Sequence, residues 1–302
     1  MMQAVQYFSY GGGSAALKHL EVPVPRPKED ELLIKVEAAS LNPIDWRIQE
    51  GILRPILPPK LLSVSSLPIP FVDCKFPFTP GVEVAGEVIE IGANIKTLKK
   101  GDKVVSLLNY HNGGGLAQYV VAQESLTAVR PIGSYATDYV ALPVAGVTAL
   151  QILKSIGAKF DGTGPKCNIL ITAASGGVGH YLVQLAHLAG LHVTATCGAR
   201  NIDLVKSLGA NEVLDYKTPE GQQLASPSGK PYDCVINCVA NTEWSSTLEA
   251  NLTSDGKVIE VTPTPVTMAR TVLDSTYTLD KAQEAWDRCM SGHATGKIVV
   301  EM

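Results

Sequence analysis

Short, mostly apolar runs with a few charged residues among them characterise the first 130 positions of the chain. These runs are rich in β-branched residues and are separated by Gly, Pro and Asp, a pattern that predicts β-strands rather than helices. The clearest of them cover residues 31–37, 84–91 and 103–107. We therefore predict a β-rich domain over residues 1–130.

The pattern changes from residue 131 onward, where compact apolar runs alternate with segments of helical periodicity. Strands are predicted at residues 168–172, 192–196, 212–214, 232–237 and 256–261. Strands that are separated by helices form parallel sheets, so residues 131–277 predict a doubly wound domain. A last helix near 280–290 and a strand at 297–301 make residues 278–302 the segment that completes the first domain.

The chain between residues 262 and 276 is too short for the elements that a six-stranded doubly wound sheet requires there. An ordinary helix has about 11 residues, and a strand and two loops would have to share the remaining positions. Either the sheet is one strand short or residues are absent from the chain at this point. The predicted fold class is α/β, with a β-rich domain and a parallel sheet with or without its sixth strand.

The composition of the chain limits its domain number, its partners and its compartment. With 302 residues, 32.1 kDa and 45% hydrophobic residues, the chain can build two cores. Its net charge of −4 and its pI near 5.9 argue against binding to nucleic acid. The longest mostly apolar run, residues 141–153, is too short to span a membrane. The six cysteines lack CxxC spacing, which favours a reducing compartment.

Residues 168–196 carry the most specific chemical signal, because they have the order strand, glycine-rich turn, helix, strand. In this order, free N–H groups at the helix N-terminus bind the pyrophosphate of a dinucleotide. We predict that this contact is made by five consecutive residues, Ser175, Gly176, Gly177, Val178 and Gly179. Ala174 replaces the first glycine of the commonest motif, and the alternative is a tight turn without a ligand.

The end of the second strand of this motif predicts which nucleotide binds. NAD sites usually have an acidic residue there for the ribose hydroxyls, whereas this chain has Cys197, Gly198 and then Arg200. A guanidinium offers several donors to a 2′-phosphate, so NADPH is predicted over NADH, with Arg200 as the phosphate ligand. Tyr216, after the third strand, is a second candidate. The alternative for Arg200 is a solvent-exposed residue at the start of the next helix.

Several further motifs follow one another in fixed order, at residues 38–45, 80–88, 101–105, 114–119, 142–150 and 173–179. Over nearly the whole chain they resemble the quinone oxidoreductase branch of the medium-chain dehydrogenase/reductase superfamily. The resemblance implies a GroES-like β-rich domain, a Rossmann NADP-binding domain and a homodimer. Residues 197–201, 214–220 and 292–297 are most similar to plant chloroplast-envelope members. This similarity implies peripheral association with the inner envelope membrane, with the cytoplasm as the alternative location.

Two segments depart from the pattern of this family. Residues 58–78 are longer than in family members, and the stretch between Val261 and Thr278 is markedly shorter, in agreement with the missing strand. In the family, the shorter region helps to line the substrate pocket and to pair subunits. A cofactor-binding but inactive envelope protein is therefore one alternative to an active enzyme.

Zinc enzymes of the same superfamily hold their metal with Cys, His and an acidic residue. At the matching positions this chain has Ser-Leu-Asn at 40–42 and Gly-Val-Glu at 81–83, so the thiolate and the imidazole are both missing. We predict a metal-free site in which Glu83 is a structural carboxylate.

Without a metal, reduction of an electrophilic conjugated acceptor needs little beyond orientation and one or two hydrogen-bond donors near the acceptor's oxygen. The predicted activity is therefore NADPH-dependent reduction of quinones or α,β-unsaturated carbonyls. The alternative is reduction of an enone or furanone with a narrow metabolic role.

The resemblance also assigns residues around the nicotinamide. It places Asn42 beside the ring as a donor, Thr148 and Lys297 in contact with the cofactor, and Cys238, Val239 and Ala240 at its flank. For three of these residues an ordinary structural role is the alternative. Asn42 would form a turn, the Thr148 hydroxyl would bond to its own helix, and Lys297 would be solvated.

Overall fold

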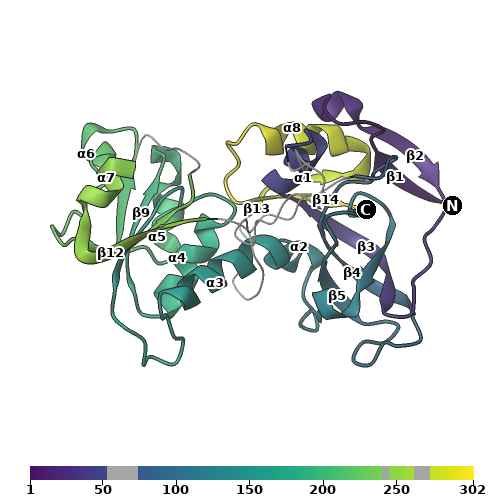
Figure 1. Ribbon diagram of the computed structural model, residues 1–302, viewed down its shortest axis with the longest axis horizontal. Coiled ribbons are helices and arrows are strands. Elements are labelled where there is room, and N and C mark those ends of the chain that lie inside the picture. Colours follow the sequence, from purple (N-terminus) through teal and green to yellow (C-terminus); the bar gives the residue numbers. More distant parts are fainter. Residues whose placement is uncertain (53–73, 240–244, 262–272) are drawn as a thin grey trace, which may run out of the picture. The chain divides into compact units, whose positions relative to one another are not determined.

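The computed structural model describes residues 1–52, 74–239, 245–261 and 273–302. Contacts divide the chain into two compact units (Figure 1). The first unit comprises Met1–Pro143 and Leu273–Met302, and the second comprises Val144–Val272. The boundaries expected from the sequence lie near residues 130 and 278.

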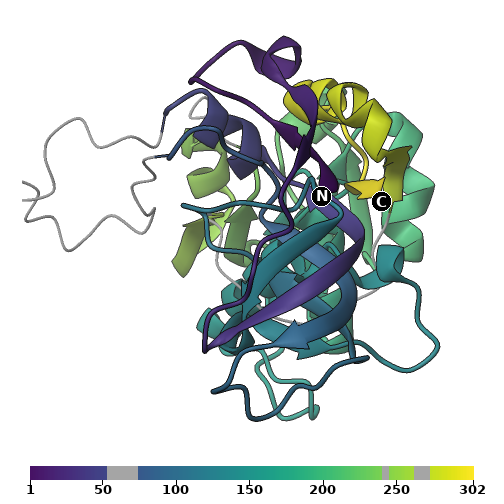
Figure 2. The same ribbon diagram turned by 90° about the vertical axis from the view of Figure 1, so that its right-hand side faces the viewer.

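Strands are the framework of the first unit, and its central strands are buried at most of their positions. Two of them, β1 (Met2–Gln6) and β2 (Lys18–Val22), make a separate antiparallel pair. The other described strands of this unit form a seven-stranded sheet in the order β13-β14-β3-β4-β5-β7, with β6 paired to β3. Figure 2 shows strands of this sheet in a second view, with its N-terminal strands in purple and its C-terminal strands in yellow. Their bounds are β3 (Glu31–Leu41), β4 (Glu83–Ile91), β5 (Lys103–Leu107), β6 (Tyr119–Gln123), β7 (Thr127–Val129), β13 (Leu273–Thr278) and β14 (Lys297–Glu301).

The long strand β3 is the centre of this sheet. It pairs with β4 along one edge, and β6 and β14 share its other edge. β14 is antiparallel to β3, and β13 lies parallel to β14. The C-terminal segment therefore completes a sheet that begins at residue 31, as expected for 297–301, whereas the strand at 273–278 was not predicted.

The helical segments of the first unit are short. Their bounds are η1 (Gly13–Ala16), α1 (Pro43–Gln49), η3 (Glu124–Leu126), α2 (Ala136–Tyr139), η7 (Leu279–Lys281) and α8 (Ala282–Met290). The indole of Trp286 in α8 is buried, and its N–H donates to Gln49 Oε1 at 3.1 Å. This bond ties α8 to α1, so two helices that are far apart in the sequence pack together.

The second unit is built on parallel strands in the order β10-β9-β8-β11-β12. Its strands are β8 (Asn168–Ile171), β9 (His192–Cys197), β10 (Glu212–Asp215), β11 (Tyr232–Asn237) and β12 (Leu252–Glu260). Its helices are α3 (Val147–Ser155), α4 (Gly179–Leu188), η5 (Ala199–Asn201), α5 (Ile202–Ser207), α6 (Pro219–Gln222) and α7 (Ser245–Ala250). The chain starts at the middle strand and extends to both sides, which is the doubly wound arrangement. The α/β prediction is confirmed.

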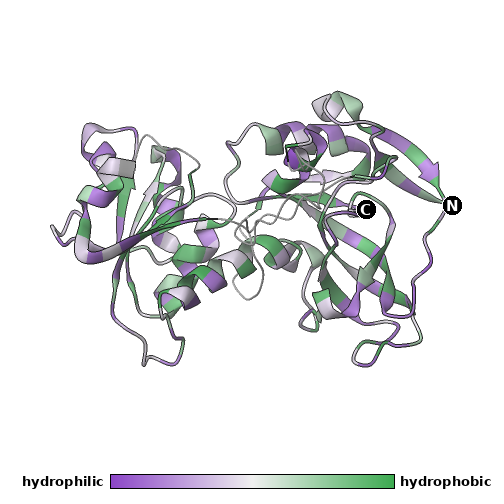
Figure 3. Cartoon of the chain, viewed as in Figure 1, coloured by the Kyte–Doolittle hydropathy of each residue, from purple (hydrophilic) through white to green (hydrophobic). Residues whose placement is uncertain are grey.

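The three middle strands of this sheet are buried almost throughout, as in parallel sheets that are covered on both faces. The helix α4 is mostly hydrophobic (Figure 3), and seven of its ten residues are buried, so most of its surface packs inside the unit. The described part of the unit contains five strands. Residues 262–272, where the sequence is too short for a sixth strand, lie outside the described residues.

One helical run of the described chain, Ala136–Ser155, is long and apolar enough to cross a membrane. It joins α2 to α3 through the turn at Leu142–Gly146 (η4) and has 20 residues, more than the apolar run 141–153. However, 67% of its apolar window is buried inside the protein, as in the core helix of a water-soluble fold. Its length alone is therefore weak support for a membrane span.

Candidate functional site

The glycine-rich turn of the second unit joins β8 to α4. Its N–H groups at Ala174 and Gly176 donate to Thr196 O and Ala173 O, both at 2.8 Å. A Cβ at Gly179 would lie only 2.3 Å from Ala173 O, so only glycine lets the helix begin so close to the turn. In the part of the chain that the structure describes, the N–H groups of three predicted site residues donate no hydrogen bond, namely Ser175, Gly177 and Val178.

A side chain that the sequence analysis missed links this turn to the next strand. Asn201 Nδ2 donates to Ser175 Oγ at 3.0 Å, from the short helix η5 that follows β9. His180, which is buried in the first turn of α4, has its Nδ1 2.8 Å from Gly176 O. These contacts fix the turn from both sides and leave its unused N–H groups at the start of α4.

The predicted 2′-phosphate residues lie around the end of β9. Arg200 is exposed, and the Tyr216 ring lies over Gly198, where a Cβ would be 3.7 Å from the ring. Lys217 Nζ is 5.9 Å from the centroid of that ring and adds a second cation. Asp215 pairs with Cys197 across the strands, and its Oδ1 accepts the Lys217 N–H at 3.0 Å. The structure therefore brings two cations, an aromatic ring and one carboxylate to this strand end.

A hydrogen-bonded group holds the end of β11, where Cys238 and Val239 were predicted to flank the cofactor. The hydroxyl of Thr172 donates to Asn237 Oδ1 at 2.8 Å and accepts the Cys238 N–H at 2.9 Å. Asn237 Nδ2 donates in turn to both carboxylate oxygens of Glu260. Burial, and then the charge of Glu260, raises the pKa of Cys238 to about 12, so its thiol stays protonated. The third predicted residue here, Ala240, lies outside the described residues.

Thr148 is buried in α3, and its hydroxyl donates to Val144 O at 2.8 Å. A bond of this kind to the residue's own helix was the alternative, in the sequence analysis, to a contact with the cofactor. Its predicted contact with the nicotinamide stays a prediction.

The first unit contains a buried polar cluster, which consists of Asn42, Asp45, Glu83 and Lys297. The Lys297 ammonium donates to Asn42 Oδ1 at 2.5 Å and lies 3.1 Å from Glu83 Oε1. Asn42 Nδ2 donates to the same Glu83 oxygen at 2.7 Å. The side chains of Lys297 and Glu83 are 3% and 0% exposed, so Lys297 is not a solvated lysine. Glu83 has an ion-pair partner, in keeping with a structural carboxylate.

Asp45 is the member of this cluster that the sequence analysis missed. It forms a capping box at the start of α1, where its Oδ2 accepts the Asn42 N–H at 2.7 Å. The spacing Asn-Pro-x-Asp at 42–45 could have revealed it. Burial is the main cause that raises the pKa of Asp45 to about 7. Its Oδ1 is buried and has no hydrogen-bond partner among the described residues.

Tyr110 lies at the border of the cluster. It is half-buried, and burial together with the charges of Glu83 and Asp45 raises its pKa to about 12. The buried polar cluster is therefore close to a side chain that reaches solvent.

Asp45 should make the stability of the protein depend on pH. Its pKa rises from 3.8 in the unfolded chain to about 7 in the fold, so the native state keeps its proton longer. Stability from this group is complete below pH 4 and is lost as the pH rises to about 7, by on the order of 4 kcal/mol. The melting temperature of the Asp45→Asn variant, measured from pH 4 to 8, should lack this part of the decline. If the melting temperatures of the wild type and the variant fall in parallel between pH 4 and 8, Asp45 does not have a raised pKa in the fold.

The predicted absence of zinc concerns the same region. Among the described residues, no group of three or more His, Cys, Asp or Glu side chains is arranged to hold a metal ion. The metal-free site stays a prediction that rests on the residue types at 40–42 and 81–83.

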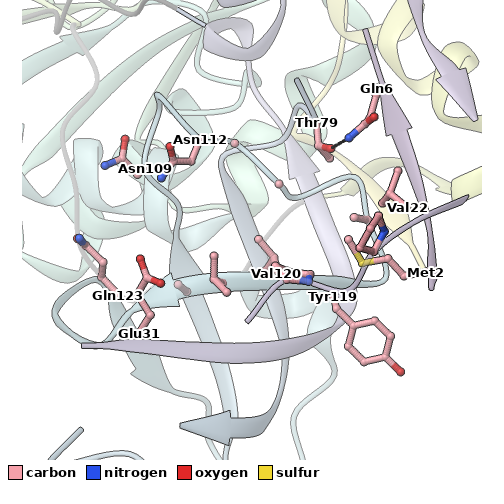
Figure 4. Close-up of a pocket in the computed structure, with 17 residues that line it drawn as sticks. Met2, Gln6, Val22, Glu31, Thr79, Asn109, Asn112, Tyr119, Val120 and Gln123 are labelled. Atoms are coloured by element: carbon pink, nitrogen blue, oxygen red, sulfur yellow. Dashed lines mark hydrogen bonds between the residues drawn. The ribbon is translucent and has the colours of Figure 1, made fainter. Parts of the chain in front are cut away.

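A pocket of about 320 Å³ lies within the first unit, beside β6 (Figure 4). Polar side chains such as Asn109, Asn112 and Gln123 line it together with Met2 and Val22, and Gln6 bonds to Thr79 at its edge. It contains none of the predicted site residues. The predicted chemistry therefore lies elsewhere.

Three models of known families match stretches of this chain. The family model described as an alcohol dehydrogenase GroES-like domain matches residues 28–147. Two models described as zinc-binding dehydrogenase match residues 177–281 and 267–300.

Individual relatives are similar over the whole chain. The chloroplast envelope quinone oxidoreductase homolog of Arabidopsis thaliana is 51% identical, over 100% of this chain and 98% of its own. The NADPH-dependent alkenal/one oxidoreductase of the same plant is 28% identical, over 99% of this chain and 79% of its own. The solved quinone oxidoreductase of Coxiella burnetii is 25% identical, with a TM-score of 0.79 over 100% and 99% of the two chains.

The alignment with the first of these relatives also compares the lengths of the two chains. It spans 340 positions, whereas this chain has 302 residues, all of them covered. The relative therefore carries residues without a counterpart in this chain.

Proposed function

The chain belongs to the medium-chain dehydrogenase/reductase family of oxidoreductases, and from this membership we propose that it is an NADPH-dependent reductase of quinones or α,β-unsaturated carbonyls. The observation that carries the proposal is the turn before α4. Its N–H groups at Ser175, Gly177 and Val178 donate to no described residue, and they precede a helix N-terminus, which favours anions.

Residues of the second unit support dinucleotide binding at two places, the pyrophosphate and the nicotinamide. The unused N–H groups of the turn would hold the pyrophosphate, and Gly179 lets the helix come close enough for this contact. The bonds from Thr172 fix the backbone at Cys238, which would flank the nicotinamide. When bound, NADPH would supply a hydride from carbon 4 of its nicotinamide.

The end of β9 supports NADPH rather than NADH. Arg200 and Lys217 bring positive charge to the strand end, and Tyr216 offers a phenol beside Gly198. A phosphate dianion gains from such charge-assisted donors, whereas a ribose hydroxyl prefers a carboxylate acceptor. The carboxylate nearby, Asp215, already accepts the Lys217 N–H. One relative is also named an NADPH-dependent oxidoreductase.

We further propose that the reaction needs no zinc. The Glu83 carboxylate is neutralised by the ammonium of Lys297 at 3.1 Å, so a positive charge already occupies this part of the first unit. The acceptor is then one that is electrophilic by itself, such as a quinone or an enone, because these need only orientation and a donor near the oxygen.

The names of two relatives support a chloroplast location, one at the envelope. We propose that this chain is chloroplastic, associates peripherally with the inner envelope membrane and forms a homodimer. A cytoplasmic location is the alternative.

The test is NADPH oxidation by the purified protein with a panel of quinones and short alkenals. We expect turnover with several acceptors and a lower KM for NADPH than for NADH. Activity confined to one enone or furanone would favour the narrow metabolic alternative. Tight NADPH binding without turnover would indicate an inactive binding protein. The short stretch between Val261 and Thr278 is the reason to consider this alternative. If neither nucleotide binds, the proposed enzyme does not exist.

A further inference from the structure

The buried polar cluster contains two candidate donors for the oxygen of an acceptor, Asn42 and Lys297, and the structure distinguishes between them. The following inference rests on the proposed function and identifies the group that acts on this oxygen.

The amide of Asn42 is fully engaged inside the cluster. Its Oδ1 accepts from Lys297 at 2.5 Å, and its Nδ2 lies 2.7 Å from Glu83 Oε1 and 3.4 Å from Ser40 O. Both amide hydrogens therefore already point to acceptors, one of them weakly. Asn42 could serve a substrate oxygen only by giving up one of these bonds.

The ammonium of Lys297 has one donor left. It carries three N–H groups, and among the described residues it contacts only Asn42 Oδ1 and Glu83 Oε1. With 3% of its side chain exposed, the third N–H has little access to bulk water. A buried donor without a partner is costly and is often found where a ligand supplies the partner.

The charge of Lys297 also favours a role in binding a ligand or in the reaction. Burying an ammonium beside a carboxylate rarely adds net stability compared with apolar side chains of similar size. The pair therefore has little structural advantage to explain it, whereas a fixed positive charge in a dry site strongly stabilises negative charge that develops during a reaction.

We propose that Lys297 is a catalytic residue that donates its third N–H to the carbonyl oxygen of the quinone or enone, while Asn42 and Glu83 hold the ammonium in position. The hydride brings both electrons, so one C–H bond breaks on the nicotinamide and one bond to hydrogen forms on the acceptor. The negative charge that this leaves on the acceptor's oxygen is stabilised by the ammonium. A proton from water completes the product, and Lys297 keeps its own protons.

The test compares two variants, Lys297→Met and the double variant Lys297→Met with Glu83→Gln. The single variant leaves Glu83 buried without its partner, and the double variant removes that unpaired charge. If Lys297 acts on the acceptor, kcat should fall about 100-fold in both variants, as after loss of an oxyanion donor. The Kd for NADPH should stay within a few-fold of the wild-type value, and a large rise in this Kd would overturn the proposal in favour of the cofactor contact that the resemblance implies for Lys297. Lys35→Met, at an exposed lysine of β3, is the matched control and should keep the wild-type kcat.

Recovery of the wild-type kcat in the double variant would overturn the proposal, because Lys297 would then only neutralise Glu83. If the methionine variants do not fold, the kcat of Lys297→Gln tests the proposal instead, because glutamine keeps hydrogen bonds to the cluster without the charge. A wild-type kcat in that variant would also overturn the proposal, and a loss of about 100-fold would support it. Failure of the proposed function is seen separately, because the wild-type protein itself would then show no turnover.

Discussion

Replacing Gly179 with alanine is expected to abolish measurable NADPH binding. The new Cβ would lie 2.3 Å from Ala173 O and 2.7 Å from Ala174 Cα, both backbone atoms that cannot turn away. The start of α4 must then move, and it carries the N–H groups of the proposed pyrophosphate site with it. Since overpacking against backbone costs about 3 kcal/mol, stability should fall as well. Fluorescence titration with NADPH and urea denaturation measure the two effects.

Gly190, just beyond the other end of α4, provides the matched control. It has a φ of +73°, and a Cβ there would meet no atom within 4 Å. Gly190→Ala should cost about 1 kcal/mol of stability through its backbone conformation and should leave the Kd for NADPH unchanged. A Gly179→Ala protein that binds NADPH as the wild type does would remove the turn from the proposal.

Arg200→Glu should reverse the preference between the two nucleotides. The variant loses charge-assisted donors to the 2′-phosphate and places a carboxylate against it, with a combined cost of several kcal/mol. We expect the ratio of kcat/KM for NADPH to that for NADH to fall about 500-fold, mainly through KM for NADPH. The KM for NADH should change little, because NADH has no phosphate at this position.

The same change of charge at Lys206 is the control for this variant. Lys206 is exposed on α5, the helix that follows η5, and Lys206→Glu should leave the nucleotide preference within a few-fold of the wild type. An unchanged preference in Arg200→Glu would show that this guanidinium does not bind the phosphate. Tyr216 and Lys217 would then be the remaining candidates.

The second unit could be predicted well because its signals are local. The strand expected at 168–172 is β8 (Asn168–Ile171), and α4 begins at Gly179, the last residue of the predicted turn. The apolar runs are strong here because strands covered on both faces need apolar residues at nearly every position. The strand at 232–237 is therefore found at its predicted bounds.

The strand β13 escaped prediction for the opposite reason. Its sequence, Leu-Asp-Ser-Thr-Tyr-Thr, lies at the edge of the sheet and is half exposed, so no apolar run marks it. An edge strand gains its stability from its neighbour, here β14, which single-sequence patterns do not show.

The buried polar cluster could not be found from the sequence because its members come together only in the fold. Asn42 and Lys297 are 255 positions apart, yet they share a hydrogen bond. A lysine on a C-terminal strand is usually solvated, and only the pairing of β14 with β3 buries it. Asp45 was missed as well, although its capping spacing to Asn42 is local and could have revealed it.

The position of β14 has a consequence for the order in which the protein is made. During synthesis, residues 38–41 of β3 are made early, but the strand that pairs with them, β14, is made more than 250 residues later. The second unit is contiguous from Val144 to Val272, so it can fold while the first unit still has an open sheet edge. Until β14 has been made, that edge is free to pair with other chains. We therefore expect the nascent protein to need a chaperone that covers the open edge of β3 until β14 pairs with it.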